Sequence, residues 1–380
     1  MSESIDQFHI GLEDSLLQDL RDRLGRTRFP DQIEGTNWEY GIPIGYLREL
    51  VEYWRDTFDW RAQEAHLNSF SQFRTQIDGQ SIHFIHAKSP HADALPLLIT
   101  HGWPGSIVEF LEVIPRLTDP ESFGGSASDS FHVVAPSLPG YGFSEPTRTP
   151  GWDEGRIANA FIALMRRLGY TRYGAQGGDW GAQVTTRIGA LDPEHCAAIH
   201  LNMALGARPE SQTSLTDEEQ ADLTAIQLFV KDESGYANEQ GTKPQPLGVA
   251  LNDSPAGLLA WIVEKFRTWS DCDGHPENCF TREQMLTNVM LYWATQTSAS
   301  SARLYWESRH SDSSARLPFV DAPTGVARYP KEILRWPRSW VERQYNVVHW
   351  AVMERGGHFA AMEQPDLFVE DLRTFFRLVR

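Results

Sequence analysis

The chain has 380 residues, of which 41% are hydrophobic and 22% charged, and its formal net charge is -17 at pH 7. This composition is typical of a globular protein with a substantial core, and the length fits two domains or one large α/β domain with an inserted segment. The negative charge disfavours nucleic acid and anionic membrane surfaces as partners, so a neutral small molecule is favoured as the substrate.

The sequence contains no targeting or membrane signal. Its N-terminal segment is mixed and polar, and no apolar run reaches the length of a membrane-spanning helix. The three cysteines, Cys196, Cys272 and Cys279, are too few for a disulfide framework and favour a reducing compartment. We therefore expect a cytoplasmic protein without a membrane anchor.

The first predicted elements are helices and a hairpin. Leucines at helical spacing predict an amphipathic helix over 12–25, and a second helix is expected over 43–57. Two alternating stretches, 73–79 and 81–88, are joined by Asp78-Gly79 and predict a β-hairpin.

Strands and helices then alternate along the chain. Apolar strands followed by glycine loops are expected over 95–105, 131–142, 173–179 and 197–203, with helices over 106–117 and 156–169. Strands of this kind predict a parallel sheet covered on both faces. The alternation stops near residue 205 and resumes after 318, with strands at 322–330 and 346–357 and a final helix from 365. The helix-rich segment between these two parts is predicted to be a cap.

The turn after the strand at 173–179 carries the first candidate for chemistry. Asp179 stands between Gly177 and Gly181 in the order Gly-x-Asp-x-Gly, the spacing of a nucleophile elbow, where serine is usual. The bare pattern also fits a tight turn with aspartate as a helix N-cap. The apolar strand before it and the helix-like stretch after it favour the elbow, which would point the backbone N–H of Trp180 into the site as an oxyanion donor.

Two other loops should meet this elbow, because function in a parallel sheet gathers at the carboxyl ends of its strands. The loop "HGWPGS" (101–106) is expected to supply the backbone N–H of Trp103 as a second oxyanion donor, with His101 in a structural role. His358 follows a Gly-Gly turn near the C-terminus, where the order nucleophile then histidine predicts a general base.

The acid that partners this histidine is left open by the residues alone. Asp321, Glu332 and Glu342 all lie near the return of the sheet, and Glu332 is preferred because it follows the expected end of a strand.

A carboxylate at the elbow suits a different reaction from that of serine. Carboxyl groups with a pKa near about 4 are ionised at pH 7 and can attack without a base. Such a nucleophile can displace a leaving group from a saturated carbon and form an ester, which a histidine-activated water then hydrolyses. The leaving group is an epoxide oxygen or a halide.

An epoxide oxygen needs a proton, and tyrosine can donate one while neutral. Tyr236, Tyr292 and Tyr305 lie in the cap segment, and spacing does not choose among them.

The stretch "SDCDGHPENCF" (270–280) groups cysteine, histidine and acidic residues but lacks the spacing of a zinc site and the full pattern of a calcium loop. We expect neither a metal nor a cofactor.

The motifs together resemble those of epoxide hydrolases of the microsomal type, within the α/β-hydrolase superfamily. The resemblance runs over nearly the whole chain: "RLGRTRFPDQ", "HGWPGS", "PSLPGYGFSEP", "GGDWG", "KPQPLGVALNDSPAGLLAWIVEKF", "APTGVARYPKEI" and "RGGHFAAMEQP". It implies Asp179 as nucleophile, His358 as base and Glu332 as its acid. It also implies Tyr236 and Tyr305 as the proton donors, while Tyr292 has no match and is left structural. The chain is similar to the soluble microbial members, and a homodimer is possible.

The resemblance also implies the domain organisation. Residues 1–90 would form an N-terminal wrapping segment, 91–205 and 319–380 the two parts of an α/β-hydrolase core, and 206–318 a helical cap. The expected substrate is a small, neutral, apolar epoxide, with water. Two other functions compete with this one. A haloalkane dehalogenase also places tryptophan after the elbow aspartate, and a hydrolase-fold receptor would bind a small ligand without turnover.

Overall fold

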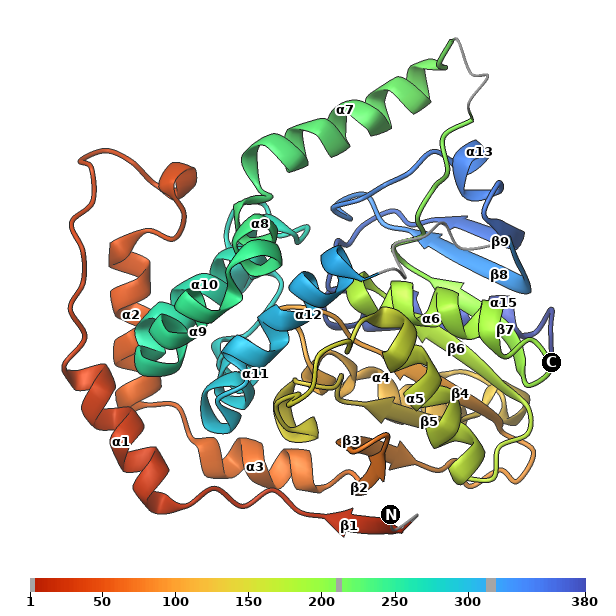
Figure 1. Ribbon diagram of the computed structural model, residues 1–380, viewed down its shortest axis with the longest axis horizontal. Helices are drawn as coiled ribbons and strands as arrows, with labels where there is room; N and C mark the ends of the chain where they lie inside the picture. The colour runs from red at the N-terminus through yellow and green to blue at the C-terminus, as the bar shows by residue number, and fades with distance from the viewer. Residues whose placement is uncertain (1–3, 210–213, 312–318) are drawn as a thin grey trace.

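A single sheet with the strand order β1-β2-β3-β5-β4-β6-β7-β8-β9 organises residues 4–209, 214–311 and 319–380, which the computed structural model describes (Figure 1). The strands are β1 (Ile5–Phe8), β2 (Gln72–Ile77), β3 (Gln80–Ala87), β4 (Leu95–Thr100), β5 (Phe131–Pro136), β6 (Tyr173–Gly177), β7 (Cys196–Leu201), β8 (Val320–Arg328) and β9 (Tyr345–Val352).

The sheet combines an antiparallel edge with a parallel centre. The pairs β1–β2, β2–β3 and β3–β5 are antiparallel, and the pairs from β5 across to β9 are parallel. The predicted hairpin is confirmed as β2 and β3, joined at Asp78 and Gly79 with φ angles of 52° and 75°. Both residues are left-handed, as a tight hairpin turn of the matching twist requires.

Helices cover both faces of the central strands, because those strands are buried on both sides. The helices α5 (Glu154–Arg167) and α6 (Asp179–Leu191) pack on one face, and α4 (Val113–Thr118) and α15 (Pro365–Phe376) pack together on the other. The shorter helices α13 (Arg338–Val341) and α14 (Ala360–Glu363) lie in the loops around β9. The predicted α/β fold with a mostly parallel sheet is confirmed.

One predicted helix is wrong in its extent. The stretch 106–117 forms a 3-10 turn, η2 (Ile107–Phe110), and then the separate helix α4, which begins at Val113. Pro115 explains the break. Its ring lacks an N–H and would clash with the carbonyl of Leu111 in a continuous helix, whereas a proline is tolerated in the first turn of α4.

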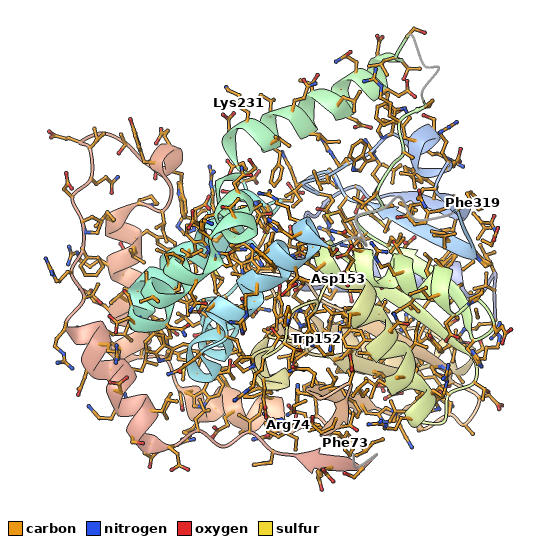
Figure 2. All side chains as sticks on the ribbon, in the orientation of Figure 1. Phe73, Arg74, Trp152, Asp153, Lys231 and Phe319 are labelled. Carbon is orange, nitrogen blue, oxygen red and sulfur yellow. The ribbon has the colours of Figure 1, made fainter. Side chains whose placement is uncertain are left out.

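Six helices lie between β7 and β8 within the described residues, and they form the predicted cap: α7 (Asp217–Asp232), α8 (Gly235–Thr242), α9 (Pro244–Asp253), α10 (Pro255–Thr268), α11 (Arg282–Thr295) and α12 (Ser298–His310). The last five pack on one another, whereas α7 extends outward, with Lys231 at its end near α8 (Figure 2). The predicted cap boundary at residue 318 lies outside the described residues, and the domain boundaries stay predictions.

The N-terminal segment begins in the sheet, runs along the outside of the cap and then returns to the sheet. Helices α1 (Asp14–Gly25) and α2 (Ile44–Asp56) contact α10, and α3 (Trp60–Asn68) contacts α11. At the edge of the sheet β1, which precedes α1, pairs with β2, and β2 pairs with β3, so the segment touches both layers. Within the described residues, no helix combines the length and apolar character needed to cross a membrane.

Candidate active site

The turn between β6 and α6 has the geometry of a nucleophile elbow. Asp179 is the first residue of α6, and its φ of +50° is a left-handed conformation that costs a non-glycine residue about 1–3 kcal/mol. The flanking glycines are needed because a Cβ on Gly177 would overlap the carbonyl of Gly181, and a Cβ on Gly181 would overlap the carbonyl of Thr100. The local sequence therefore presents the Asp179 carboxylate at the carboxyl end of β6.

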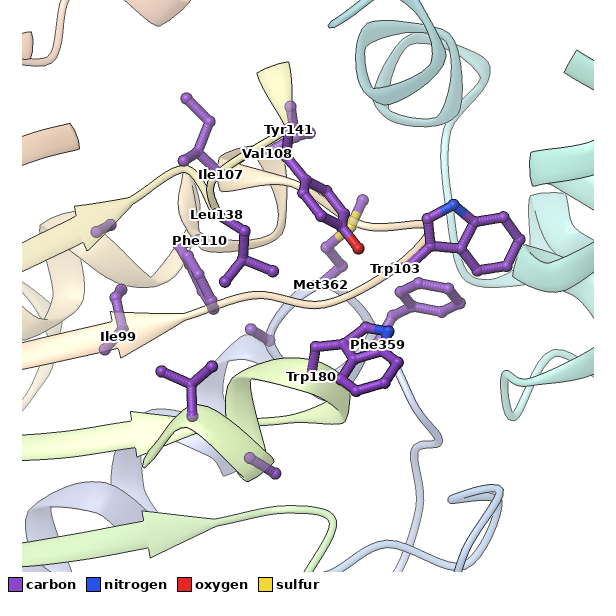
Figure 3. Packing of buried hydrophobic residues seen from close by; sticks show 14 of the residues in the cluster. Ile99, Trp103, Ile107, Val108, Phe110, Leu138, Tyr141, Trp180, Phe359 and Met362 are labelled. Atoms are coloured by element: carbon purple, nitrogen blue, oxygen red, sulfur yellow. The ribbon is translucent and has the colours of Figure 1, made fainter. Parts of the chain in front are cut away.

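A backbone amide lies beside this carboxylate. The N–H of Trp103 donates a 2.8 Å hydrogen bond to Asp179 Oδ1. Gly102 permits this approach, because a Cβ there would overlap the Asp179 side chain. Trp180 lies in the first turn of α6, where backbone N–H groups have no carbonyl partner within the helix. Figure 3 shows the loop that carries Trp103 and the helix turn that carries Trp180 at the same end of the sheet.

His358 stands between two carboxylates in the loop after β9. Its Nε2 lies 3.3 Å from Asp179 Oδ2, and its Nδ1–H donates a 2.6 Å hydrogen bond to Glu332 Oε1. Burial opposes protonation of the ring, but the charges of Glu332 and Asp179 outweigh it and hold the pKa of His358 well above its ordinary value. The two carboxylates therefore favour the imidazolium form of the ring in the free protein.

Of the three candidate acids, Glu332 is the one that the structure brings to His358. Its Oε1 also accepts the backbone N–H of Ile333 at 2.7 Å, which fixes the orientation of the carboxylate. Asp321 lies exposed on β8, and Glu342 pairs with Arg338 at 2.6 Å.

Two cap tyrosines close the site from above the sheet. Tyr236 on α8 stacks on the Trp103 ring with centroids 5.0 Å apart and planes 8° apart. Tyr305 on α12 meets the Trp180 ring edge-on at 4.8 Å, and the two tyrosine rings are 5.8 Å apart. Burial and the nearby charge of Asp179 raise the pKa of both hydroxyl groups. The pKa of Tyr305 is also raised by the neighbouring Tyr236. Both hydroxyl groups are therefore neutral at physiological pH.

The third tyrosine of the cap has a structural contact. Tyr292 on α11 donates a 2.7 Å hydrogen bond to the carbonyl of Gly105. His101 is likewise used by the backbone: its Nδ1–H donates to the carbonyl of Gly102, and its Nε2 accepts the N–H of Leu138. Burial lowers the pKa of His101 to about 4, so it is neutral.

A segment of the cap, residues 269–271, is hydrogen-bonded to the loop that carries the histidine. The His358 N–H donates to the carbonyl of Trp269 at 2.9 Å, and the indole of Trp269 packs on the imidazole with centroids 5.0 Å apart. The Gly356 N–H donates to Asp271 Oδ2 at 3.0 Å, and the Asp271 N–H donates to Glu363 Oε2 at 2.8 Å. We call this set of contacts the cap tie. It was not predicted from the sequence, which has no pattern that marks Trp269.

The cysteine-containing stretch 270–280 makes local contacts. The Cys272 thiol donates to the carbonyl of Arg267, and the Cys279 thiol to that of Asp271. Within residues 4–209, 214–311 and 319–380, no group of three or more histidine, cysteine or acidic side chains could hold a metal ion.

A parallel sheet with an elbow, an amide donor at the nucleophile position and a histidine–carboxylate pair defines an enzyme of the α/β-hydrolase class. The comparisons with known proteins agree: residues 96–325 match the family model for the alpha/beta hydrolase fold, and residues 5–110 match the model for the epoxide hydrolase N terminus. The chain belongs to the epoxide hydrolase family.

Relatives cover nearly the whole chain. A putative epoxide hydrolase of Stigmatella aurantiaca is 51% identical over 99% of this chain and 86% of that protein, and epoxide hydrolase 1 of Sus scrofa is 40% identical over 99% and 89%. Among solved structures, juvenile hormone epoxide hydrolase from Bombyx mori has a TM-score of 0.91 at 34% identity, covering 99% of this chain and 95% of that one. The Aspergillus niger epoxide hydrolase has a TM-score of 0.88 at 34% identity, covering 99% and 97%.

Proposed function

We propose that the protein converts small, neutral, apolar epoxides to vicinal diols through an ester on Asp179. One observation carries the proposal: the elbow holds a carboxylate whose Oδ1 accepts the Trp103 N–H, while its Oδ2 faces His358. A carboxylate fixed in this way is a ready nucleophile for a saturated carbon. The aromatic rings of Trp103, Trp180 and Trp269 suit an apolar substrate, and the family's named relatives are epoxide hydrolases.

The first half-reaction forms the ester. Asp179 Oδ2 attacks an epoxide carbon and forms a C–O bond, and the C–O bond to the epoxide oxygen breaks. The leaving oxygen takes a proton from Tyr236 or Tyr305, which becomes a tyrosinate. Oδ1 remains in the amide contact with Trp103 and becomes the carbonyl oxygen of the ester.

The second half-reaction depends on a change in the charge around His358. Ester formation neutralises Asp179, so one of the two charges that raise the His358 pKa is lost. The imidazolium then gives its proton to the tyrosinate, which becomes neutral again, and His358 becomes a base. It removes a proton from water while the water oxygen bonds to the Asp179 carbonyl carbon, and the developing oxyanion is held by the Trp103 and Trp180 amides.

The intermediate collapses with cleavage of the ester bond. The departing diol oxygen takes a proton from His358, and the new carboxylic acid of Asp179 then ionises and returns its proton to the imidazole. The cycle closes with epoxide and water consumed and a diol formed. Glu332 stabilises the imidazolium at each stage where it exists.

The test is to trap the ester. His358→Gln should form the ester from styrene oxide and fail to hydrolyse it, so mass spectrometry should find one substrate mass added to the peptide that contains Asp179. Asp179→Asn under the same conditions is the matched control and should add nothing. No adduct in the His358→Gln variant would overturn the scheme.

Turnover of two test substrates distinguishes the proposed function from the two alternatives. The wild-type protein should hydrolyse styrene oxide and leave 1-chlorobutane unchanged, because the neutral tyrosines serve an alkoxide rather than a halide. Chloride release would favour a haloalkane dehalogenase. Binding of both compounds without any product would favour a non-catalytic receptor.

A further inference from the structure

Glu109 is an active-site carboxyl group to which the mechanism above gives no role. It lies in η2, directly after the loop that carries Trp103, and is only partly exposed. Together with Asp179 and His358, its side chain lines a small cavity at the carboxyl ends of β4 and β6.

The position of this carboxyl group is set by two glycines. A Cβ on Gly105 would overlap Glu109 Oε1, so the carboxyl fills the space that any larger residue at 105 would take. The backbone N–H of Gly102 hydrogen-bonds to the same carboxyl group. The spacing Ser106-x-x-Glu109 would also fit a capping box, in which glutamate accepts the Ser106 N–H. Here Ser106 accepts from Val108, and the carboxyl of Glu109 is directed to Gly102 instead.

The cavity has the size and the polarity to hold a water molecule. Its volume is about 20 Å³, and roughly 10–15 Å³ suffices for one water. Two buried polar atoms of residues in its wall, Thr100 Oγ1 and Gln176 Oε1, have no hydrogen-bond partner within the described chain. A water has the two to four polar partners that it needs at such a place.

The charge state of Glu109 suits this position. Burial raises the pKa of its carboxyl group to about 8, although the positive charge of His358 acts in the opposite direction. Near neutral pH the group is mostly protonated, so it does not add a third negative charge beside Asp179 and Glu332. Its carbonyl oxygen can accept a hydrogen bond from a water in the cavity.

We propose that this cavity holds the water that hydrolyses the ester, and that Glu109 is a positioning residue for that water. One hydrogen of the water faces His358 Nε2, and the other is donated to the Glu109 carboxyl group. This arrangement aims the water oxygen at the Asp179 carbonyl carbon. The proposal rests on the ester mechanism above and adds the residue that orients the second reactant.

The experiment measures the two half-reactions separately by single-turnover kinetics with styrene oxide. Glu109→Leu removes the hydrogen bond at similar volume. It should slow ester hydrolysis about 10²-fold, the usual scale for a misplaced reactant, and change ester formation less than about twofold. Glu109→Gln keeps a carbonyl oxygen and should recover most of the hydrolysis rate. The matched control is Glu112→Leu, since Glu112 is an exposed carboxylate of the same segment that pairs with Arg116; it should behave as the wild type.

Gly105→Ala provides an independent variant if Glu109→Leu does not fold. This variant keeps the glutamate at position 109 but displaces its carboxyl group, because the new Cβ takes the space that Glu109 Oε1 occupies. It should therefore show the same selective loss of ester hydrolysis. Unchanged hydrolysis, or equal slowing of both steps, in these variants would overturn the proposal for Glu109. The ester trapped in His358→Gln would still stand in that case. Failure to trap any ester would overturn both.

Discussion

Replacing Glu332 with glutamine is expected to slow hydrolysis of the Asp179 ester far more than its formation. Glu332 Oε1 and His358 Nδ1 are 2.6 Å apart, and both side chains are buried. Opposite unit charges about 4 Å apart at an effective dielectric constant of about 20 interact by about 4 kcal/mol, and the amide removes this attraction. Because about 1.36 kcal/mol corresponds to a tenfold change in rate, hydrolysis should fall about 10³-fold.

The pH dependence of ester hydrolysis should also change in the Glu332→Gln variant. Glu332 raises the pKa of His358, and the proposed mechanism needs His358 in its neutral form to remove a proton from water. Without that carboxylate the pKa falls, so the rise of the hydrolysis rate with pH should move to lower pH.

Stopped-flow tryptophan fluorescence can follow both steps, since Trp103, Trp180 and Trp269 surround the site. The control is Glu342→Gln, which removes a carboxylate that pairs with Arg338 and should leave both rates unchanged. An unchanged hydrolysis rate in Glu332→Gln, or an equal loss in both steps, would refute the reasoning.

Three further outcomes are expected. Tyr236→Phe and Tyr305→Phe should each slow ester formation. The double variant should lose most of the rate acceleration typical of a general acid, which is about 10²–10⁴-fold or about 3–5 kcal/mol. Tyr292→Phe should keep the rate of ester formation but lose about 1 kcal/mol of unfolding free energy, measured in urea, because its hydrogen bond to Gly105 is lost. Gly181→Ala should abolish soluble, ester-forming protein on expression, because its Cβ would overlap the Thr100 carbonyl. Burial raises the pKa of Glu363 to about 7, so its contribution to stability is present in acid and lost as pH rises through about 7; Glu363→Gln should flatten that part of the Tm–pH curve relative to wild type, and parallel curves would contradict this.

The features predicted well from sequence are those that local backbone chemistry determines. Asp78-Gly79 encodes a hairpin turn because both residues accept left-handed φ angles. Gly177 and Gly181 mark the elbow because a backbone passes close to each of them. Such signals are read from a few neighbouring residues and do not depend on the rest of the fold.

The features that sequence left open depend on distant parts of the chain. The choice of Glu332 over Asp321 and Glu342 depends on the path of the loop after β8. The choice of tyrosines rests on how the cap helices are rotated over the sheet, and for these the family resemblance was needed. Glu109 lies inside the stretch predicted as the helix 106–117, and no sequence motif marks it for the role proposed above. The oxyanion, base, acid and proton-donor roles themselves stay predictions until the kinetic experiments are done.

The cap tie has a consequence for exchanging parts between relatives. The cap is joined to the core by the chain at two places, after β7 and before β8, and among its other contacts Trp269 and Asp271 bind it to the loop of His358. A chimera spliced at the two chain connections would therefore also replace residues that contact the loop of His358. We expect such grafts to keep hydrolysis only when residues 269–271 and the loop 356–363 come from the same parent, so these two segments should be inherited together.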